Sequence, residues 1–247
     1  MNSNPIPPLS FPRSLLFFGL PFLLMTLMFW GLAPLMDLMG VRLFITFLVT
    51  LGGPFLLLFL LSLRFYRKEG HPWNWQAFRE RFRLNRMRPV DWIWTIGLAV
   101  FMFGSSHILS FTYTWVAEFF PEPKILVRMF AEDPNYFMEL PLKRNWLILA
   151  GMFAFLASNV LGEEFWCRGY ILPRQELVHG KWTWLIHGLL WNAFHLFMPW
   201  QPIQLLPGTL ALPFVAQRLR NICPGIIAHF AVNIPGMVML VSGILGK

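Results

Sequence analysis

Two adjacent carboxylates and one guanidinium follow a long apolar segment of the chain. Residues 145–162 carry no charge, and Glu163, Glu164 and Arg168 come directly after them. An ionisable side chain inside a membrane-spanning segment costs about 2.5 to 3.5 kcal/mol, so it is rare unless it is paired or used. On a helix Glu164 and Arg168 are i, i+4 neighbours and are expected to pair, whereas Glu163 points about 100° away. Glu163 is therefore the first candidate for chemistry, and the Glu164–Arg168 pair is expected to support it.

A second apolar segment, residues 182–200, carries two imidazoles at helical spacing. His187, Trp191 and His195 recur every four residues, so they share one face of a helix. Asn192 lies three residues before His195 and is expected to orient it.

A third apolar segment, residues 222–245, carries His229 and Asn233 at i, i+4 on one face. Each of these polar residues alone is more often a core residue with a satisfied hydrogen bond. Taken together, the three segments supply one carboxylate, two imidazoles and one carboxamide, which is a set suited to acid–base chemistry.

The composition indicates that these segments cross a membrane. Of the 247 residues, 56% are hydrophobic and only 13% are charged, which is too little polar material to cover a soluble globule. The aromatic content of 17% also excludes disordered, collagen-like and coiled-coil chains. We therefore expect an all-α, polytopic transmembrane helical bundle.

A net charge of +8 is typical of proteins that bind nucleic acids, but the positions of the Lys and Arg residues argue against such a partner. Eight of the twenty Lys and Arg residues lie in residues 64–88, between two apolar runs, as is typical of a cytoplasmic loop. Within this loop Trp75, Phe78 and Phe82 fall at i, i+3, i+7 among arginines. This pattern predicts a cationic helix that lies in the interface and contacts membrane lipid.

About seven or eight spans are expected, because a span needs about 20 mostly apolar residues. The candidate segments are residues 14–36, 41–63, 90–120, 145–172, 182–200, 203–216 and 222–245. The sixth is short enough to be re-entrant. We expect residues 1–144 to form an N-terminal scaffold with the basic loop, and residues 145–247 to form the catalytic core.

The distribution of Lys and Arg also predicts the orientation. The N-terminus and the loop 64–88 are expected on the cytoplasmic side, with the active site toward that side.

The three motifs resemble those of the CAAX-protease and bacteriocin-processing family of membrane endopeptidases, known as CPBP or Abi proteins. The family pattern is E-E-x-x-x-R, then F-x-x-x-H, then H-x-x-x-N, each on its own membrane helix. Here the motifs begin at Glu163, Trp191 and His229, so a tryptophan replaces the family's phenylalanine in the second. The resemblance covers roughly residues 145–236 and implies an intramembrane endopeptidase that acts on a membrane-anchored, lipidated or prenylated peptide or protein.

Peptide hydrolysis needs an activated water, an acceptor for its proton and donors for the developing oxyanion. We expect Glu163 to be the general base and His195 to hold the water, and the resemblance implies the same pairing. His229 and Asn233 are then the oxyanion donors. The supporting residues are expected to be Glu164, Arg168, Trp191, Asn192 and His187.

Four alternatives stay open at this point. Glu163, His195 and His229 are ligand types that bind Zn²⁺ with an open fourth position, although no cofactor is required by the glutamate mechanism and no H-E-x-x-H motif is present. A thiol mechanism at Cys167 is disfavoured by the neighbouring carboxylates. A non-catalytic scaffold or immunity protein would keep the same fold, and an ion-coupled transporter would also use intramembrane charges.

Overall fold

The structure is a computed structural model that describes residues 6–131 and 133–246. In these residues the fold is all-α, apart from the two-residue strands β1 (Tyr136–Phe137) and β2 (Leu140–Pro141), which pair antiparallel. The N-terminal helical elements are α1 (Phe11–Thr26), η1 (Leu27–Leu32), α2 (Ala33–Leu38), α3 (Leu43–Phe47), η2 (Leu48–Gly52), α4 (Gly53–Lys68), α5 (Trp75–Arg81), α6 (Pro89–Ile108), α7 (Phe111–Phe119) and α8 (Lys124–Met129). The remaining ones are α9 (Trp146–Glu163), η3 (Glu164–Ile171), α10 (Leu172–His179), η4 (Gly180–Trp182), α11 (Thr183–Phe194), η5 (His195–Phe197), α12 (Pro202–Leu219) and α13 (Cys223–Leu245).

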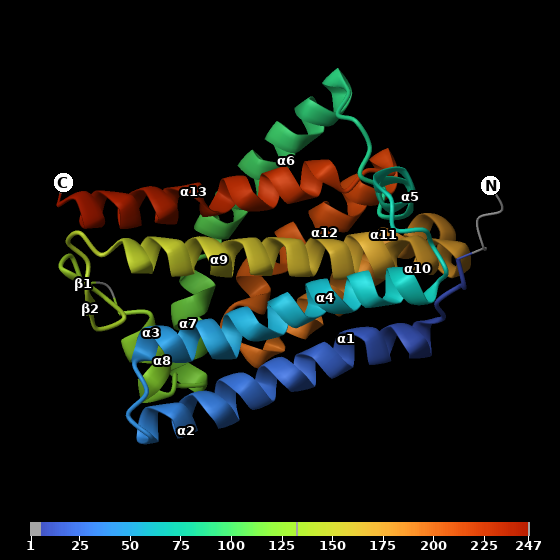
Figure 1. Ribbon diagram of the computed structural model, residues 1–247. Coiled ribbons are helices and arrows are strands. Elements are labelled where there is room, and N and C mark those ends of the chain that lie inside the picture. The colour runs from blue at the N-terminus through green and yellow to red at the C-terminus, as the bar shows by residue number, and fades with distance from the viewer. Residues whose placement is uncertain (1–5, 132, 247) are drawn as a thin grey trace.

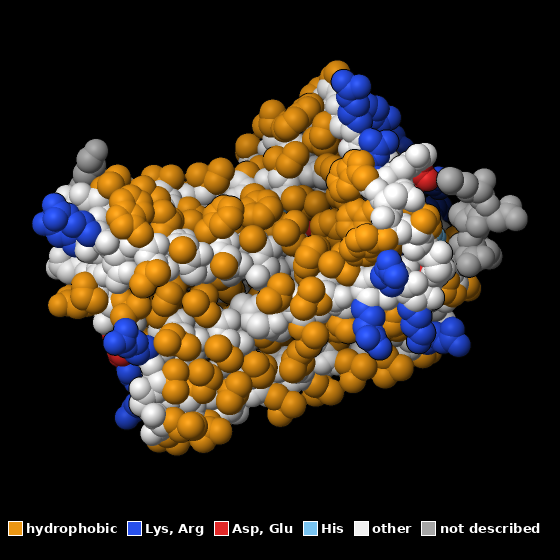
Figure 2. All heavy atoms as spheres, in the orientation of Figure 1, with side chains coloured by type: hydrophobic (Ala, Val, Ile, Leu, Met, Phe, Trp, Pro, Cys, Tyr) orange, Lys and Arg blue, Asp and Glu red, His pale blue; other side chains and the backbone are white. Residues whose placement is uncertain are grey.

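Several of these helices are long and apolar enough to cross a membrane. Among the described residues, four candidate spans occur: Phe11–Leu38, Leu43–Lys68, the continuous run Trp146–Phe197, and Cys223–Leu245. A fifth is counted if α6 and α7, which meet at a bend of 46°, form one broken span. Figure 2 shows hydrophobic side chains along the sides of the helices and Lys and Arg gathered toward the ends. The chain is thus a multi-pass membrane protein.

The expected count of seven or eight spans is not confirmed. Most of two predicted segments, 145–172 and 182–200, lies within the one candidate span Trp146–Phe197, although Gly180 turns the chain between them, and the segment 90–120 is broken near Leu109. The sixth segment becomes α12, an 18-residue helix that is not among the candidate spans.

The two ends of the bundle carry different parts of the chain (Figure 1). The N-terminal end of α1, the loop with α5, and α10 lie at one end, whereas the C-terminus and the β1–β2 hairpin lie at the other. The first end is tied together by Arg83, whose guanidinium donates two hydrogen bonds of 2.7 Å to Glu176, and by Asn85, which donates to the carbonyl of Arg220. Which end faces the cytoplasm stays a prediction, and the first five residues of the predicted cytoplasmic N-terminus lie outside the described residues.

Glycines let the helices around the site approach closely. A methyl group at Gly162, next to Glu163, would overlap the backbone carbonyl of Phe55, so α9 lies directly against α4 here. At Gly188 the corresponding methyl group would lie 2.7 Å from the carbonyl oxygen of Thr209, which brings α11 against α12. These contacts set the distances between the elements that carry the motifs.

The helix that carries Glu163 is longer than the sequence pattern indicates. The predicted segment ends at residue 172, whereas α9 continues through the π-helix η3 and α10 as far as His179. Pro173 is the second residue of α10 and directly follows the π-helix η3. Gly180 then turns the chain with a φ of 53° before α11 starts.

The predicted cationic helix forms as α5, and part of its aromatic pattern packs against the protein. Trp75 is exposed, whereas Phe82 is fully buried and contacts Phe78 and Phe165. Arg81 is also buried, and it donates a 3.0 Å hydrogen bond to the carbonyl of Gly169 in η3. The regular spacing of these side chains thus reflects packing against η3, and the contact of α5 with membrane lipid remains a prediction.

Candidate active site

Glu163 is the last residue of α9 and is almost completely buried, with 2% of its surface exposed. Its Oε1 lies 3.5 Å from Nε2 of His195, which is longer than a direct hydrogen bond. Both side chains line a cavity of about 1420 Å³. A carboxylate, an imidazole and a space for a reactant therefore meet at one point.

His195 follows the last turn of α11 and starts the short helix η5. Its Nδ1 lies 2.9 Å from the backbone carbonyl of Trp191. Because a carbonyl only accepts hydrogen bonds, Nδ1 must carry a proton and donate it. In the neutral ring Nε2 is then an acceptor, and it is Nε2 that faces Glu163.

Glu164 is fully buried and holds two motifs together. Both of its carboxylate oxygens accept from the guanidinium of Arg168, so the expected i, i+4 ion pair forms within η3. Its Oε1 also lies 3.2 Å from Nδ1 of His229 on α13. At Gly225, one turn of α13 before His229, a methyl group would come within 2.9 Å of Glu164 Oε2, so the absence of a side chain makes room for the carboxylate.

The third motif places a carboxamide beside this imidazole. Asn233 lies one turn after His229 on α13, and its Nδ2 donates a 2.8 Å hydrogen bond to the backbone carbonyl of His229. Both residues line the cavity. Because an amide nitrogen carries two protons, Asn233 keeps one donor for a ligand.

Trp191 packs between the ion pair and His195. The guanidinium of Arg168 stacks on the Trp191 indole, 3.8 Å from the ring centroid, and the indole contacts the His195 ring edge to face at 5.5 Å. Trp191 also lines the cavity. The aromatic residue of the second motif therefore holds a cation and an imidazole in place.

Two residues expected to support the site do something else. Asn192 does not orient His195, because its Oδ1 accepts a 3.2 Å hydrogen bond from Thr209 on α12, on another face of α11. His187 is fully buried away from the cavity lining, and its Nδ1 lies 2.7 Å from Gln175. Both side chains join helices together, and neither reaches the reacting groups.

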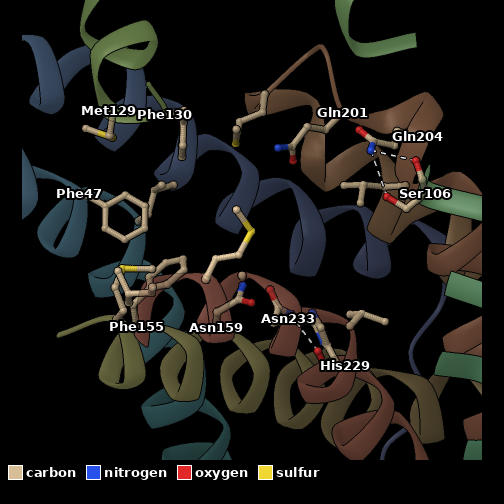
Figure 3. Close-up of a pocket in the computed structure, with 18 of the residues that line it drawn as sticks. Phe47, Ser106, Met129, Phe130, Phe155, Asn159, Gln201, Gln204, His229 and Asn233 are labelled. Atoms are coloured by element: carbon tan, nitrogen blue, oxygen red, sulfur yellow. Dashed lines mark hydrogen bonds between the residues drawn. The ribbon is translucent and has the colours of Figure 1, made fainter. Parts of the chain in front are cut away.

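The cavity has a polar side and an apolar end (Figure 3). Asn159, Asn233 and His229 lie along one wall, Ser106, Gln201 and Gln204 lie across from them, and Phe47, Met129, Phe130 and Phe155 gather at one end. Asn159 was not predicted from the sequence. It is a lone carboxamide in an apolar run, four residues before Glu163, and this position could have indicated it.

The described residues do not bring three metal ligands together. No group of three His, Cys, Asp or Glu side chains within them is placed to hold a metal ion, so Glu163, His195 and His229 do not form the alternative Zn²⁺ set. Cys167 is buried and does not belong to the described lining of the cavity, which leaves its thiol without access to a substrate there.

An all-α, multi-pass membrane protein whose spanning helices bring a buried glutamate and two imidazoles to one cavity belongs to the class of membrane proteins with an intramembrane polar site. Residues 144–235 match the family model described as Type II CAAX prenyl endopeptidase Rce1-like. The match confirms the resemblance drawn from the three motifs. No curated protein and no solved structure matches the chain. The matched family is one of CAAX-type prenyl endopeptidases, which are hydrolases that act on a protein substrate.

Proposed function

We propose that the protein is an endopeptidase that hydrolyses a peptide bond of a membrane-anchored, prenylated protein or peptide with a water activated by Glu163. The observation that carries this proposal is the buried Glu163 carboxylate, 3.5 Å from His195 Nε2 on the wall of the cavity. The family match at residues 144–235 supports the substrate class.

The facing atoms suit a bound water. With Nδ1 protonated, His195 Nε2 and the Glu163 carboxylate are both acceptors, and a water between them can donate one hydrogen to each. Its lone pairs then point away from both groups, toward a substrate carbonyl. As the water oxygen bonds to the carbonyl carbon, Glu163 accepts the proton, and the tetrahedral intermediate forms.

The side chains of Asn233 and His229 stabilise the developing oxyanion. Asn233 has one free N–H, and His229 presents Nε2 when its ring carries both protons, with the Glu164 carboxylate compensating the charge at Nδ1. One donor of this kind is typically worth about 10² to 10³ in kcat. Collapse of the intermediate breaks the C–N bond, and the proton held by Glu163 passes to the leaving amine.

The experiment incubates the purified protein with peptides that carry a farnesylated cysteine followed by three residues, and reads the products by mass. Glu163→Gln keeps the shape of the side chain but removes the base, so cleavage should fall by at least about 100-fold while the protein stays folded. Glu80→Gln, at an exposed position of α5, is the matched control and should cut normally.

A second arm of the same experiment adds a strong chelator, and the glutamate mechanism expects cleavage to survive it. Residual cleavage by Glu163→Gln above a few per cent would move the base elsewhere. Absence of cleavage by the unmodified chain, with solute flux in liposomes instead, would favour the transporter. A scaffold would show neither.

A further inference from the structure

A second carboxamide lies on the cavity wall, one helical turn before the base. Asn159 and Glu163 are i, i+4 on α9, and both side chains line the cavity. Within the described part of the chain, the Asn159 carboxamide has no hydrogen-bond partner. A polar group in a membrane-spanning helix is costly unless it is satisfied or used. The placement of Asn159 therefore indicates a ligand contact.

The polar groups on α9 and α13 lie in two successive layers. The two helices run in opposite directions and contact each other (Figure 1). Asn159 precedes Glu163 by one turn and Asn233 follows His229 by one turn, so both carboxamides lie on the same side of the reacting groups. Figure 3 shows Asn159 and Asn233 next to each other, between His229 and the apolar end of the cavity.

A peptide substrate that reaches the apolar end must pass its main chain through this layer. Each peptide group carries one N–H and one C=O, and leaving either unpaired away from water costs free energy. A carboxamide offers both a donor and an acceptor. Asn233 already donates one N–H to the His229 carbonyl, whereas Asn159 keeps its full capacity.

We propose that Asn159 is a substrate-binding residue whose carboxamide hydrogen-bonds the peptide group next to the scissile bond, on the side that leads to the apolar end of the cavity. This inference rests on the proposed function. It assigns to Asn159 recognition of the substrate main chain, with no part in activating the water.

The test measures binding separately from cleavage. In the inactive Glu163→Gln background, the dissociation constant of a fluorescent farnesylated peptide is compared with and without Asn159→Leu. Loss of one hydrogen bond should weaken binding about 3- to 10-fold. In the active background Asn159→Leu should raise KM by a similar factor and change kcat less.

A substrate with an ester in place of a flanking amide identifies the group that is bound. Esters are placed in turn at the linkage on each side of the scissile bond, which removes one N–H. In the Glu163→Gln background, one of these esters should bind more weakly than the all-amide peptide. When Asn159→Leu is added, that ester and the all-amide peptide should bind with equal affinity. Asn159→Ala repeats the measurement without the bulk of leucine. Ser158→Ala changes the neighbouring residue, which lies outside the cavity lining, and should leave the affinities for all three peptides unchanged.

The outcomes separate the two proposals. If both esters weaken binding equally with and without Asn159, the inference about Asn159 is wrong while the hydrolase stands. If the peptide binds in an Asn159-dependent way but is never cut, the hydrolase proposal fails and the binding role stands. A chain that neither binds nor cuts the peptide overturns both.

Discussion

At the scale of single residues, the orientation of His195 depends on the backbone of its own helix. The acceptor for Nδ1 is the Trp191 carbonyl, one turn earlier, so the ring is held without a second carboxylate. This leaves Glu163 with no competitor for the side of the ring that faces the cavity. Glu164, in contrast, is engaged by Arg168 and His229 and has no free oxygen to serve as a base. The two adjacent glutamates thus have different partners, which is why only one is a candidate base.

Replacing Trp191 tests whether its stacking positions the site. A desolvated cation–π contact is worth about 2 kcal/mol, so Trp191→Leu should destabilise the protein by about that amount and lower kcat. Trp191→Phe introduces the residue of the family pattern and keeps an aromatic ring under Arg168. This variant should therefore retain most of the stability and most of kcat. Thermal unfolding in detergent and the cleavage assay are the measurements.

The control is Trp184→Leu, on the same helix but outside the described cavity lining, where the indole contacts Phe214. It should leave kcat unchanged. A kcat loss equal to that of Trp191→Leu would mean that the effect comes from general loosening of α11.

Side-chain pairing within a helix was predictable from the sequence, but contacts between helices were not. The spacing of Glu164 and Arg168 gave their ion pair directly. Helical spacing also grouped His187 and Asn192 with His195, yet Gln175 and Thr209 from other elements hold the first two. Periodicity defines a face, and only packing decides which neighbour that face meets.

At the scale of elements, the close contact between α4 and α9 fixes the height and rotation of Glu163. Gly162→Ala should force the two helices apart, because a backbone carbonyl, that of Phe55, stands where the methyl group would go. We expect a loss of about 1 to 3 kcal/mol in stability, the usual cost of overpacking, with a marked fall in cleavage.

The matched control is Gly97→Ala on α6, where a methyl group meets nothing within 4 Å. It should be neutral or stabilising by up to about 1 kcal/mol, since alanine favours a helix over glycine. Equal loss of melting temperature for both variants would show that the α4–α9 contact is not special.

The loop element α5 packs against η3, the segment that follows Glu163. Arg81 donates to Gly169 and to Glu69, and burial lowers the pKa of Arg81 to about 10, so the guanidinium remains charged at neutral pH. The sequence indicated the helix and its charge. It did not show that Phe82 would be buried, because the aromatic spacing of an interfacial helix and of a docked helix is the same.

At the scale of the whole molecule, the all-α membrane fold followed from composition, whereas the number of spans did not. Apolar length alone does not show where a helix continues past a proline or bends, as it does at Pro173 and near Leu109. The separation into a scaffold of residues 1–144 and a catalytic core also stays a prediction. Phe47, Met102 and Ser106 of the first part line the cavity together with the motif residues.

The orientation of the bundle can be tested with single cysteines. In a background with Cys167 and Cys223 replaced by alanine, Arg79→Cys at the α5 end should react with an impermeant maleimide only after the cells are opened. The reason is that Lys and Arg collect in cytoplasmic loops and the loop 64–88 is rich in them. Lys143→Cys lies at the opposite end of the bundle and should react in intact cells. The reverse pattern would place the α5 end of the bundle outside the cell.

The π-helix η3 separates Glu163 from α10. Its hydrogen bonds join residues five apart in place of four, so it holds extra residues compared with an α-helix. Deleting one residue from 169–171 would let the segment relax to an α-helix and would leave α9 and α10 close to their present register, because the wide turn of a π-helix absorbs one extra residue. Related sequences aligned with this one should therefore tolerate a one-residue gap there, whereas a gap between Glu164 and Arg168 would break the i, i+4 spacing of their ion pair.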